Sequence, residues 1–261
     1  MQYADLSYKT PEVFTNKHPN SRILIIADGP STKKILDKKT ILKQYFDVII
    51  SVNHGFAYFD DIIDYHLVTE KVSPTNKVVK MLSEKSYSKS VPRILNWKGI
   101  EKYDQSYNIY KTTRHPFTTN SNIRKYKDGA VEGFLTGPAN SRNMAVGSVS
   151  LNAMHLACIL GATTIYTIGT DLVFKDEFDH FYDDHMYRGK EYKKIVKAEN
   201  RVHIIDIELN GKKYQTTDYF KDSADYINKS IIGPFKDIEV FDFSEGLITS
   251  ANTITVEAFF S

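Results

Sequence analysis

Short, continuous runs of apolar residues, each followed at once by small or polar residues, constrain the fold of this 261-residue chain most strongly. The run RILIIAD (22–28) is rich in β-branched residues and is followed by Gly29 and Pro30. The runs DVIISVN (47–53) and DYHLVTE (64–70) have the same form. None of them alternates apolar with polar residues, which is typical of strands buried on both faces of a parallel sheet.

Segments with helical spacing separate these runs, so strands and helices alternate along the chain. The first helix is expected to begin after Ser31, whose side chain is a suitable N-cap. The predicted helices cover 32–45, 73–85, 147–162 and 219–231, and the further strands cover 91–97, 163–171, 201–208 and 238–243. A turn at Asn210-Gly211 follows the strand at 201–208.

The alternation predicts one α/β domain over residues 1–261, with a Rossmann-like, mostly parallel sheet flanked by helices. Residues 1–20 are expected to be a lead-in to this domain. The stretches 98–140 and 174–192 show no sustained period and are predicted to be lid or insertion loops.

Composition excludes several classes of protein. A formal charge of +2 argues against a nucleic-acid binder that depends on a broad basic surface. Cys158 is the only cysteine, so no internal disulfide framework is expected. No apolar run approaches the roughly 20 residues of a membrane span. We therefore expect a cytoplasmic protein, with peripheral association at the inner face of the membrane left open.

The strand ends are the expected ligand site, because ligands of open parallel sheets bind at the carboxyl ends of the strands. Small or polar residues follow four predicted strands. They are Asp28-Gly29-Pro30-Ser31, Asn53-His54-Gly55, Thr69-Glu70 and Gly169-Thr170-Asp171.

The turn 28–31 has two interpretations. From the local pattern alone it is a tight turn with a serine cap, since it lacks the glycines and lysine of the known phosphate loops. Alternatively, Gly29 lets a ligand approach and the helix N-terminus offers N–H groups to a phosphate. Asp28 repels phosphate and suits a ribose hydroxyl, a metal or a backbone amide better.

The segment DEFDHFYDDHMYR (176–188) concentrates acidic, histidine and tyrosine side chains. It is either a solvated loop or a source of a metal site or a general base. His155 lies on an apolar helix face and is expected in the core, as is Cys158. His18, His66, His115 and His203 have no supporting neighbours. No nucleophile elbow is present, which argues against covalent hydrolase chemistry.

The ordered set ILIIADGPS, DVIISVNHGFAYF and GSVSLNAMHLACILGATTIYTIGTDLVF, followed by an aromatic loop, resembles bacterial glycosyltransferase family 42, the sialyltransferases of host-mimicking mucosal bacteria. It equally resembles the MptE-like family, which includes flagellin-glycosylating motility-associated factors and an archaeal hydroxymethylpterin pyrophosphokinase. The segment 210–248 is closer to the MptE-like pattern. The resemblance covers about two-thirds of the chain and omits about 75–140.

The resemblance implies a sialyltransferase-like variant of the GT-A fold with a lid. The reaction it implies is an inverting transfer of a nonulosonic acid from a CMP-activated donor to a glycan or glycoconjugate acceptor. The resemblance further implies that the reaction needs no cofactor or metal. The CMP-sugar is the donor substrate. Family analogy also favours a homo-oligomer.

Site residues follow from the same resemblance. Asp28 stands where the sialyltransferases have an asparagine that touches the donor phosphate and ribose. Asn53 matches a donor-binding asparagine, while His54 and Thr69 replace a glutamine and another asparagine. Ser148 or Ser150 falls near a nucleotide-contacting serine, and Gly169 and Asp171 match a G-x-D turn beneath the nucleotide.

Two family positions differ in this chain. Val173 occupies the position of one lid tyrosine, and Tyr182 is the expected substitute for the other. Thr216 or Thr217 stands where the family has its catalytic histidine. Threonine is no base near neutral pH, so we expect His185, ahead of His180, to act as the base.

Two other functions stay open. One is an MptE-like pyrophosphokinase that transfers diphosphate from ATP to a hydroxymethylpterin-like acceptor. It would need Mg²⁺, with Asp171, Asp183 and Asp184 as ligands to test. The other is a catalytically inactive nucleotide-binding module. The excess of aromatic residues, 17 Tyr and 15 Phe, is expected to cover a sugar nucleotide from 103–134 and 174–192.

Overall fold

The computed structural model describes residues 4–5, 14–72, 90–97, 109–111, 149–174, 203–232, 235 and 237–261. The helix predicted at 73–85 lies outside these ranges. So do the predicted loops at 98–140 and 174–192, apart from residues 109–111 and 174.

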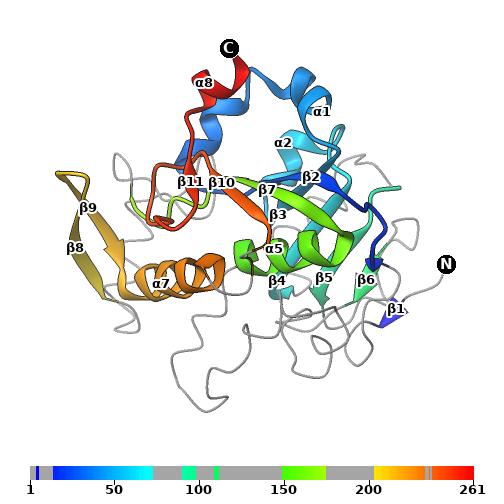
Figure 1. Ribbon diagram of the computed structural model, residues 1–261. Coiled ribbons are helices and arrows are strands. Elements are labelled where there is room, and N and C mark those ends of the chain that lie inside the picture. Colours follow the sequence, from blue (N-terminus) through cyan, green and yellow to red (C-terminus); the bar gives the residue numbers. More distant parts are fainter. Residues whose placement is uncertain are drawn as a thin grey trace.

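A parallel sheet of nine strands forms the centre of the molecule (Figure 1). Its order is β1-β6-β5-β4-β3-β2-β7-β10-β11, and every neighbouring pair runs parallel. The strands are β1 (Ala4–Asp5), β2 (Ser21–Ile26), β3 (Val48–Val52), β4 (Tyr65–Val72), β5 (Arg93–Trp97), β6 (Ile109–Lys111), β7 (Ala162–Ile168), β10 (Glu239–Asp242) and β11 (Asn252–Thr253). The Rossmann-like α/β fold expected from the buried apolar runs is therefore confirmed.

Strand order reverses at β2. From β2 the chain adds β3, β4, β5 and β6 on one side, and β7 then pairs with the other side of β2. Loops that leave β2 and β7 consequently run to opposite sides of the sheet. This arrangement creates a topological switch point, the usual ligand position in folds of this class.

Helices cover both faces of the sheet (Figure 1). On one face lie α5 (Val149–Leu160) and α7 (Asp218–Ile232); on the other lie α1 (Leu42–Tyr45), α2 (Phe56–Phe59) and α8 (Val256–Phe260). The core is divided in the same way. Ile23 and Ile25 of β2 pack with α5 and α7, whereas Leu24 and Ile26 pack with the other helices.

A two-stranded antiparallel hairpin stands beyond α7, made of β8 (Ile204–Leu209) and β9 (Lys212–Thr217). Asn210 and Gly211 join the strands with φ angles of 52° and 74°. Two residues with positive φ are what a tight hairpin turn requires, and the turn predicted from this dipeptide is confirmed.

The long helix predicted at 32–45 is wrong. The segment contains η2 (Pro30–Ile35), η3 (Lys39–Ile41) and the single turn α1. Its turns close through bonds between residues three apart, such as Leu36 N–H to Lys33 O and Ile41 N–H to Lys38 O. This is tighter 3-10 geometry, which is seldom extended over long runs. The helices α5 and α7 fall where the sequence predicts them, α5 being followed by Gly161 with φ +102°, whereas the short helices α2 and α8 were not predicted.

Within the described ranges, no helix is long and apolar enough to cross a membrane.

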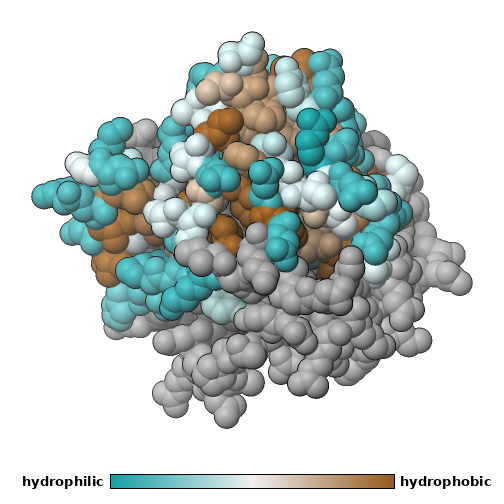
Figure 2. All heavy atoms as spheres, in the orientation of Figure 1, coloured by the Kyte–Doolittle hydropathy of each residue, from teal (hydrophilic) through white to brown (hydrophobic). Residues whose placement is uncertain are grey.

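Aromatic side chains attach α8 to the sheet. Phe259 stacks on Phe46 with ring centroids 5.5 Å apart and meets Tyr166 and Phe243 at 5.2 and 5.3 Å. Apolar residues reach the surface beside α8 (Figure 2). Part of the aromatic excess therefore packs this face of the sheet, a use that the sequence pattern did not indicate.

We expect Phe259→Ala to lower the free energy of unfolding by about 2 kcal/mol, because it removes the half-buried ring that joins α8 to the sheet. Glu257→Gln is the matched control, since Glu257 is exposed on the same helix and should change stability by less than about 0.5 kcal/mol. Urea denaturation measures both. Equal losses in the two variants would contradict this account of α8.

Candidate functional site

The polar strand ends meet at the switch point. Residues 28–31 follow β2, residues 53–55 follow β3 and residues 169–171 follow β7. The backbone N–H of Gly29 donates to Gly169 O at 2.8 Å, which joins two of these ends directly. The convergence predicted for these three strand ends is thus observed. Thr69 differs, because it lies within β4 in the register break between Val68 and Val72 rather than beyond the strand.

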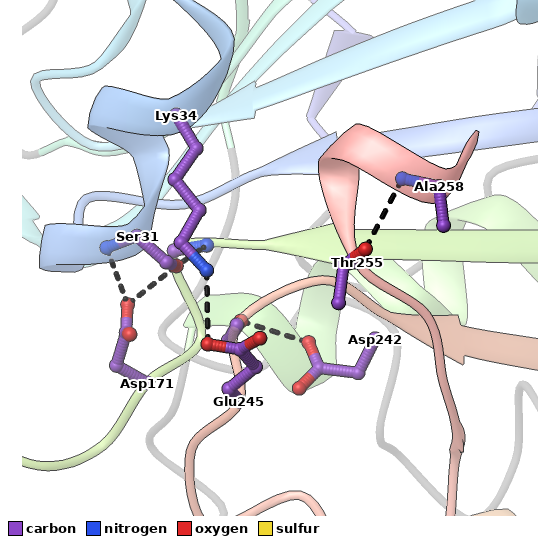
Figure 3. A network of polar contacts seen from close by, with 9 residues as sticks. Ser31, Lys34, Asp171, Asp242, Glu245, Thr255 and Ala258 are labelled. Carbon is purple, nitrogen blue, oxygen red and sulfur yellow. Dashed lines mark hydrogen bonds and ion pairs between the residues drawn. The ribbon is translucent and has the colours of Figure 1, made fainter. Parts of the chain in front are cut away.

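Ser31 and Asp171 join the loops after β2 and β7 (Figure 3). Asp171 Oδ2 accepts from Ser31 Oγ at 2.7 Å and from Ser31 N–H at 3.1 Å. Ser31 Oγ in turn accepts from the N–H of Gly169 at 2.9 Å. Ser31 and Asp171 are both buried. The expected serine cap is therefore wrong: η2 has Gly29 at its N-cap position and no side-chain cap.

These bonds also correct the phosphate-loop interpretation of the turn. The N–H groups of Gly29, Ser31 and Thr32 bind Gly169 O, Asp171 Oδ2 and Gly29 O, respectively. Pro30, at the first position of η2, has no N–H. The turn is therefore held by the protein itself, and its amides are not set out as an anion cradle.

Asp28 adopts one of the three roles expected for it. Its Oδ1 accepts from Gly55 N–H at 2.8 Å, and its Oδ2 accepts from His54 N–H at 3.2 Å. His54 Nδ1 lies 3.9 Å from the same Oδ2. The carboxylate thus binds backbone amides and ties the end of β2 to the end of β3.

Asn53 is held in an unusual conformation, with φ +46°. Its N–H donates to Leu67 O at 3.0 Å, and its carbonyl oxygen lies 2.7 Å from His66 Nε2. Its Oδ1 is buried and has no hydrogen-bond partner within the described ranges. A buried amide oxygen without a partner can accept a hydrogen bond from any N–H or O–H donor that reaches it.

Asp242 is a buried acidic residue that sequence reasoning missed. It ends β10 (Figure 3), and its Oδ1 accepts from Thr167 Oγ1 at 2.7 Å and from Ser244 Oγ at 2.8 Å. Ser244 Oγ also accepts from Thr170 N–H at 3.1 Å. Burial raises the pKa of the Asp242 carboxyl to about 7, with a smaller contribution from the charge of Asp171. The signal available in the sequence was an Asp near the end of the strand predicted at 238–243, with Ser244 and Glu245 directly after that strand.

The side chain of Lys34 crosses the switch point from η2 to the loop after β10 (Figure 3). Its Nζ lies 2.9 Å from Glu245 Oε2, and both side chains are partly exposed. The charge of Lys34 is therefore already paired with a carboxylate.

Thr216 and Thr217, where the resemblance places a catalytic histidine, are buried structural residues. The hydroxyl of Thr216 donates to Leu172 O, and Thr217 Oγ1 accepts from Phe220 N–H at 3.0 Å at the start of α7. Val173 is buried as well.

Some predicted residues are not placed. His185, His180, Tyr182, Asp183, Asp184 and Ser148 lie outside the described residues. Ser150 is buried in α5, as is His155, which agrees with the predicted core histidine. Cys158 is half-buried, and burial raises the pKa of its thiol well above the ordinary value. Across the described ranges, no group of three or more His, Cys, Asp or Glu side chains could hold a metal ion.

Comparisons with known proteins give one fold-level likeness. No family model matches the chain, and no curated protein matches it. The structure of the Maf glycosyltransferase from Magnetospirillum magneticum AMB-1 is similar, with a TM-score of 0.57 and 16% sequence identity over 99% of this chain. The chain spans 36% of the length of that protein. The two proteins share a fold, the α/β arrangement described above.

Replacement of Gly169 by alanine should lower the free energy of unfolding much more than the same replacement at Gly211, a glycine with a similar φ angle. Gly169 has φ +78°, and an added Cβ would lie 2.3 Å from both Ala27 O and Thr32 Oγ1. Gly211 has φ +74° and no atom within 4 Å of such a Cβ. We expect G211A to lose about 1 kcal/mol of unfolding free energy and G169A more than about 3 kcal/mol. Equal losses in urea denaturation would mean that the close approach at Gly169 is unimportant.

Asp242→Asn should remove a pH dependence of stability. Between pH 3.8, the ordinary pKa, and about 7, the folded protein holds a proton that the unfolded chain has lost. The wild-type free energy of unfolding therefore falls as pH rises through this window, by at most about 1.4 kcal/mol per pH unit from this group. Urea titrations should show the stability of D242N relative to wild type rising with pH and levelling above about 7. A difference that is constant with pH would contradict the buried, proton-holding carboxyl.

Proposed function

We propose that the protein is a glycosyltransferase whose donor, a nucleotide-activated sugar, binds at the switch point of the sheet. The observation that carries the proposal is the convergence of Asp28, Asn53 and Asp171 on the carboxyl edge of β2, β3 and β7. This is the edge at which open α/β sheets take ligands. The fold shared with a Maf glycosyltransferase supports the reaction class by analogy.

The proposed donor is a CMP-activated nonulosonic acid, and the acceptor is a glycan or glycoconjugate. This choice rests on the resemblance of the strand-end segments to the sialyltransferase and MptE-like families. Recognition would be local, because the net charge is +2 and Lys34 is paired with Glu245. Asn53 Oδ1 would accept from a hydroxyl or amino group of the nucleotide, and His54 beside it would face the phosphate.

The proposed transfer is inverting and needs a base. The base removes the proton of an acceptor hydroxyl while that oxygen bonds to the anomeric carbon and the bond to the CMP phosphate oxygen breaks. His185 is the first candidate and His180 the second, with Tyr182 assisting the departing phosphate. Thr216 and Thr217 cannot take this role, since their hydroxyls are buried in structural hydrogen bonds.

Binding of cytidine nucleotides tests the proposal. At about 100 times its Kd, CMP should add about 2.7 kcal/mol of stability and raise the melting temperature. Asn53→Ala should abolish most of this shift. Asn210→Ala is the matched control, because Asn210 has a similar φ of 52° in the exposed hairpin turn. N210A should lose a similar amount of intrinsic stability and keep the full response to CMP.

The outcomes also separate the alternative functions. No shift with any cytidine nucleotide at saturation would overturn the cytidine-dependent form of the proposal. Consumption of ATP that depends on Mg²⁺ and on a pterin acceptor would favour the pyrophosphokinase. Binding of CMP without turnover of any activated sugar would favour an inactive nucleotide-binding module.

A further inference from the structure

A fully buried charge lies beside the candidate site without belonging to it. Arg93, the first residue of β5, has no exposed surface, and its Nη2 lies 2.6 Å from Asp60 Oδ1 just after α2. Its guanidinium also lies over the ring of Phe56, 5.1 Å from the centroid. A buried guanidinium is costly unless it is paired and hydrogen-bonded, so an arrangement of this kind calls for a physical explanation.

Arg93 connects this ion pair to His66. The two residues are register partners on β5 and β4, and Arg93 Nη1 lies 3.2 Å from His66 Nδ1. A guanidinium only donates, so His66 Nδ1 must accept. The imidazole is then neutral and carries its proton on Nε2, which donates to Asn53 O at 2.7 Å.

The surroundings of His66 keep it in that state. The imidazole is fully buried, and its ring centroid lies 4.3 Å from that of Phe56. Burial, followed by the charge of Arg93, lowers the pKa of His66 well below 6.5, and His54 acts in the same direction. The donor to Asn53 therefore does not change its charge across the neutral pH range.

The backbone conformation of Asn53 is one that hydrogen bonds to neighbouring residues must stabilise. Its φ of +46° is uncommon for a residue other than glycine, although Asn tolerates it better than most. Both of its backbone polar groups bind β4, the N–H through Leu67 O and the C=O through His66. These two hydrogen bonds fix the backbone conformation at the end of β3. They therefore also fix the position of the Asn53 Cα, from which the side chain extends.

We propose that Asp60, Arg93 and His66 form a positioning relay that fixes the His66 tautomer and, through the Asn53 carbonyl, holds the Asn53 carboxamide for the donor nucleotide. The inference rests on the proposed function for its ligand and extends it to three residues that do not touch that ligand. None of the three is a catalytic residue.

The first test needs no ligand. In ¹⁵N spectra of histidine-labelled wild-type protein, His66 should show an unprotonated Nδ1 and a protonated Nε2, unchanged across neutral pH. His66→Leu should increase hydrogen exchange at the Asn53 amide by about tenfold or more, because the carbonyl bond that restrains the residue is lost. A protonated ring, the other tautomer, or unchanged exchange in H66L would overturn the relay.

The second test uses rescue. His66→Gln keeps an N–H donor that can reach the Asn53 carbonyl, whereas His66→Leu keeps only bulk. We expect H66L to weaken CMP binding about tenfold by calorimetry and H66Q to recover most of that loss. His155→Leu is the matched control, since it removes a buried histidine on α5 and should leave the CMP affinity unchanged.

The two sets of results separate the relay from the proposed function. If wild type binds no CMP while H66L alone loosens Asn53, the proposed function fails and the relay stands. If N53A loses CMP binding while H66L and H66Q both bind like wild type, the relay fails and the function stands. Equal weakening in H66L and H155L would also overturn the relay, since it would reflect general destabilisation.

Discussion

The hydrogen bonds between Ser31 and Asp171 hold together two loops that the sheet topology sends in opposite directions. A single carboxylate oxygen accepts both the hydroxyl and the backbone N–H of Ser31, and the same hydroxyl accepts from Gly169. Because Ser31 and Asp171 are buried, this network of hydrogen bonds takes the place of the water that their polar groups would otherwise bind. Without it, the carboxyl ends of β2 and β7 would have unsatisfied polar groups at the very point where the sheet divides.

The neighbouring strand ends are organised in the same way. Asp28 binds the amides after β3, and Asp242 accepts the hydroxyls of Thr167 and Ser244 between β7 and β10. Carboxylates thus tie the end of β2 to the ends of β3 and β7, and the end of β7 to the end of β10. The proposed ligand edge therefore contains several acidic side chains that are bound to amides and hydroxyls of the protein itself. Its polar character comes from these groups and not from a basic surface.

The fold was predictable because buried parallel strands have a plain sequence pattern. The runs at 22–28, 47–53 and 163–171 lack polar alternation, and each is a strand at the centre of the sheet. The interrupted segment after Pro30 was not predictable, because the buried residues Ile35 and Leu42 are spaced as on one face of an α-helix although η2 and η3 are 3-10 turns. Tertiary contacts decided its geometry.

The site was predictable in place but not in detail. Parallel topology implies that strand ends meet, so residues 28–31, 53–55 and 169–171 could be grouped from the sequence. The partners of each side chain could not be, because Ser31 and Asp171 are 140 residues apart. His66 was missed for the same reason: its partner Arg93 lies on another strand, and an isolated histidine in an apolar run carries no signal of that pairing.

The sequence distance between Ser31 and Asp171 also bears on how the molecule is made. Pairing of β2 with β3 joins residues about 25 positions apart, whereas pairing of β2 with β7 joins residues about 140 apart and carries a larger loop-closure cost. During synthesis, β7 leaves the ribosome long after β2 to β4 are available to pair. The switch point is therefore completed late, and a nascent chain that has its first strands in order still lacks the β7 side of the proposed ligand site.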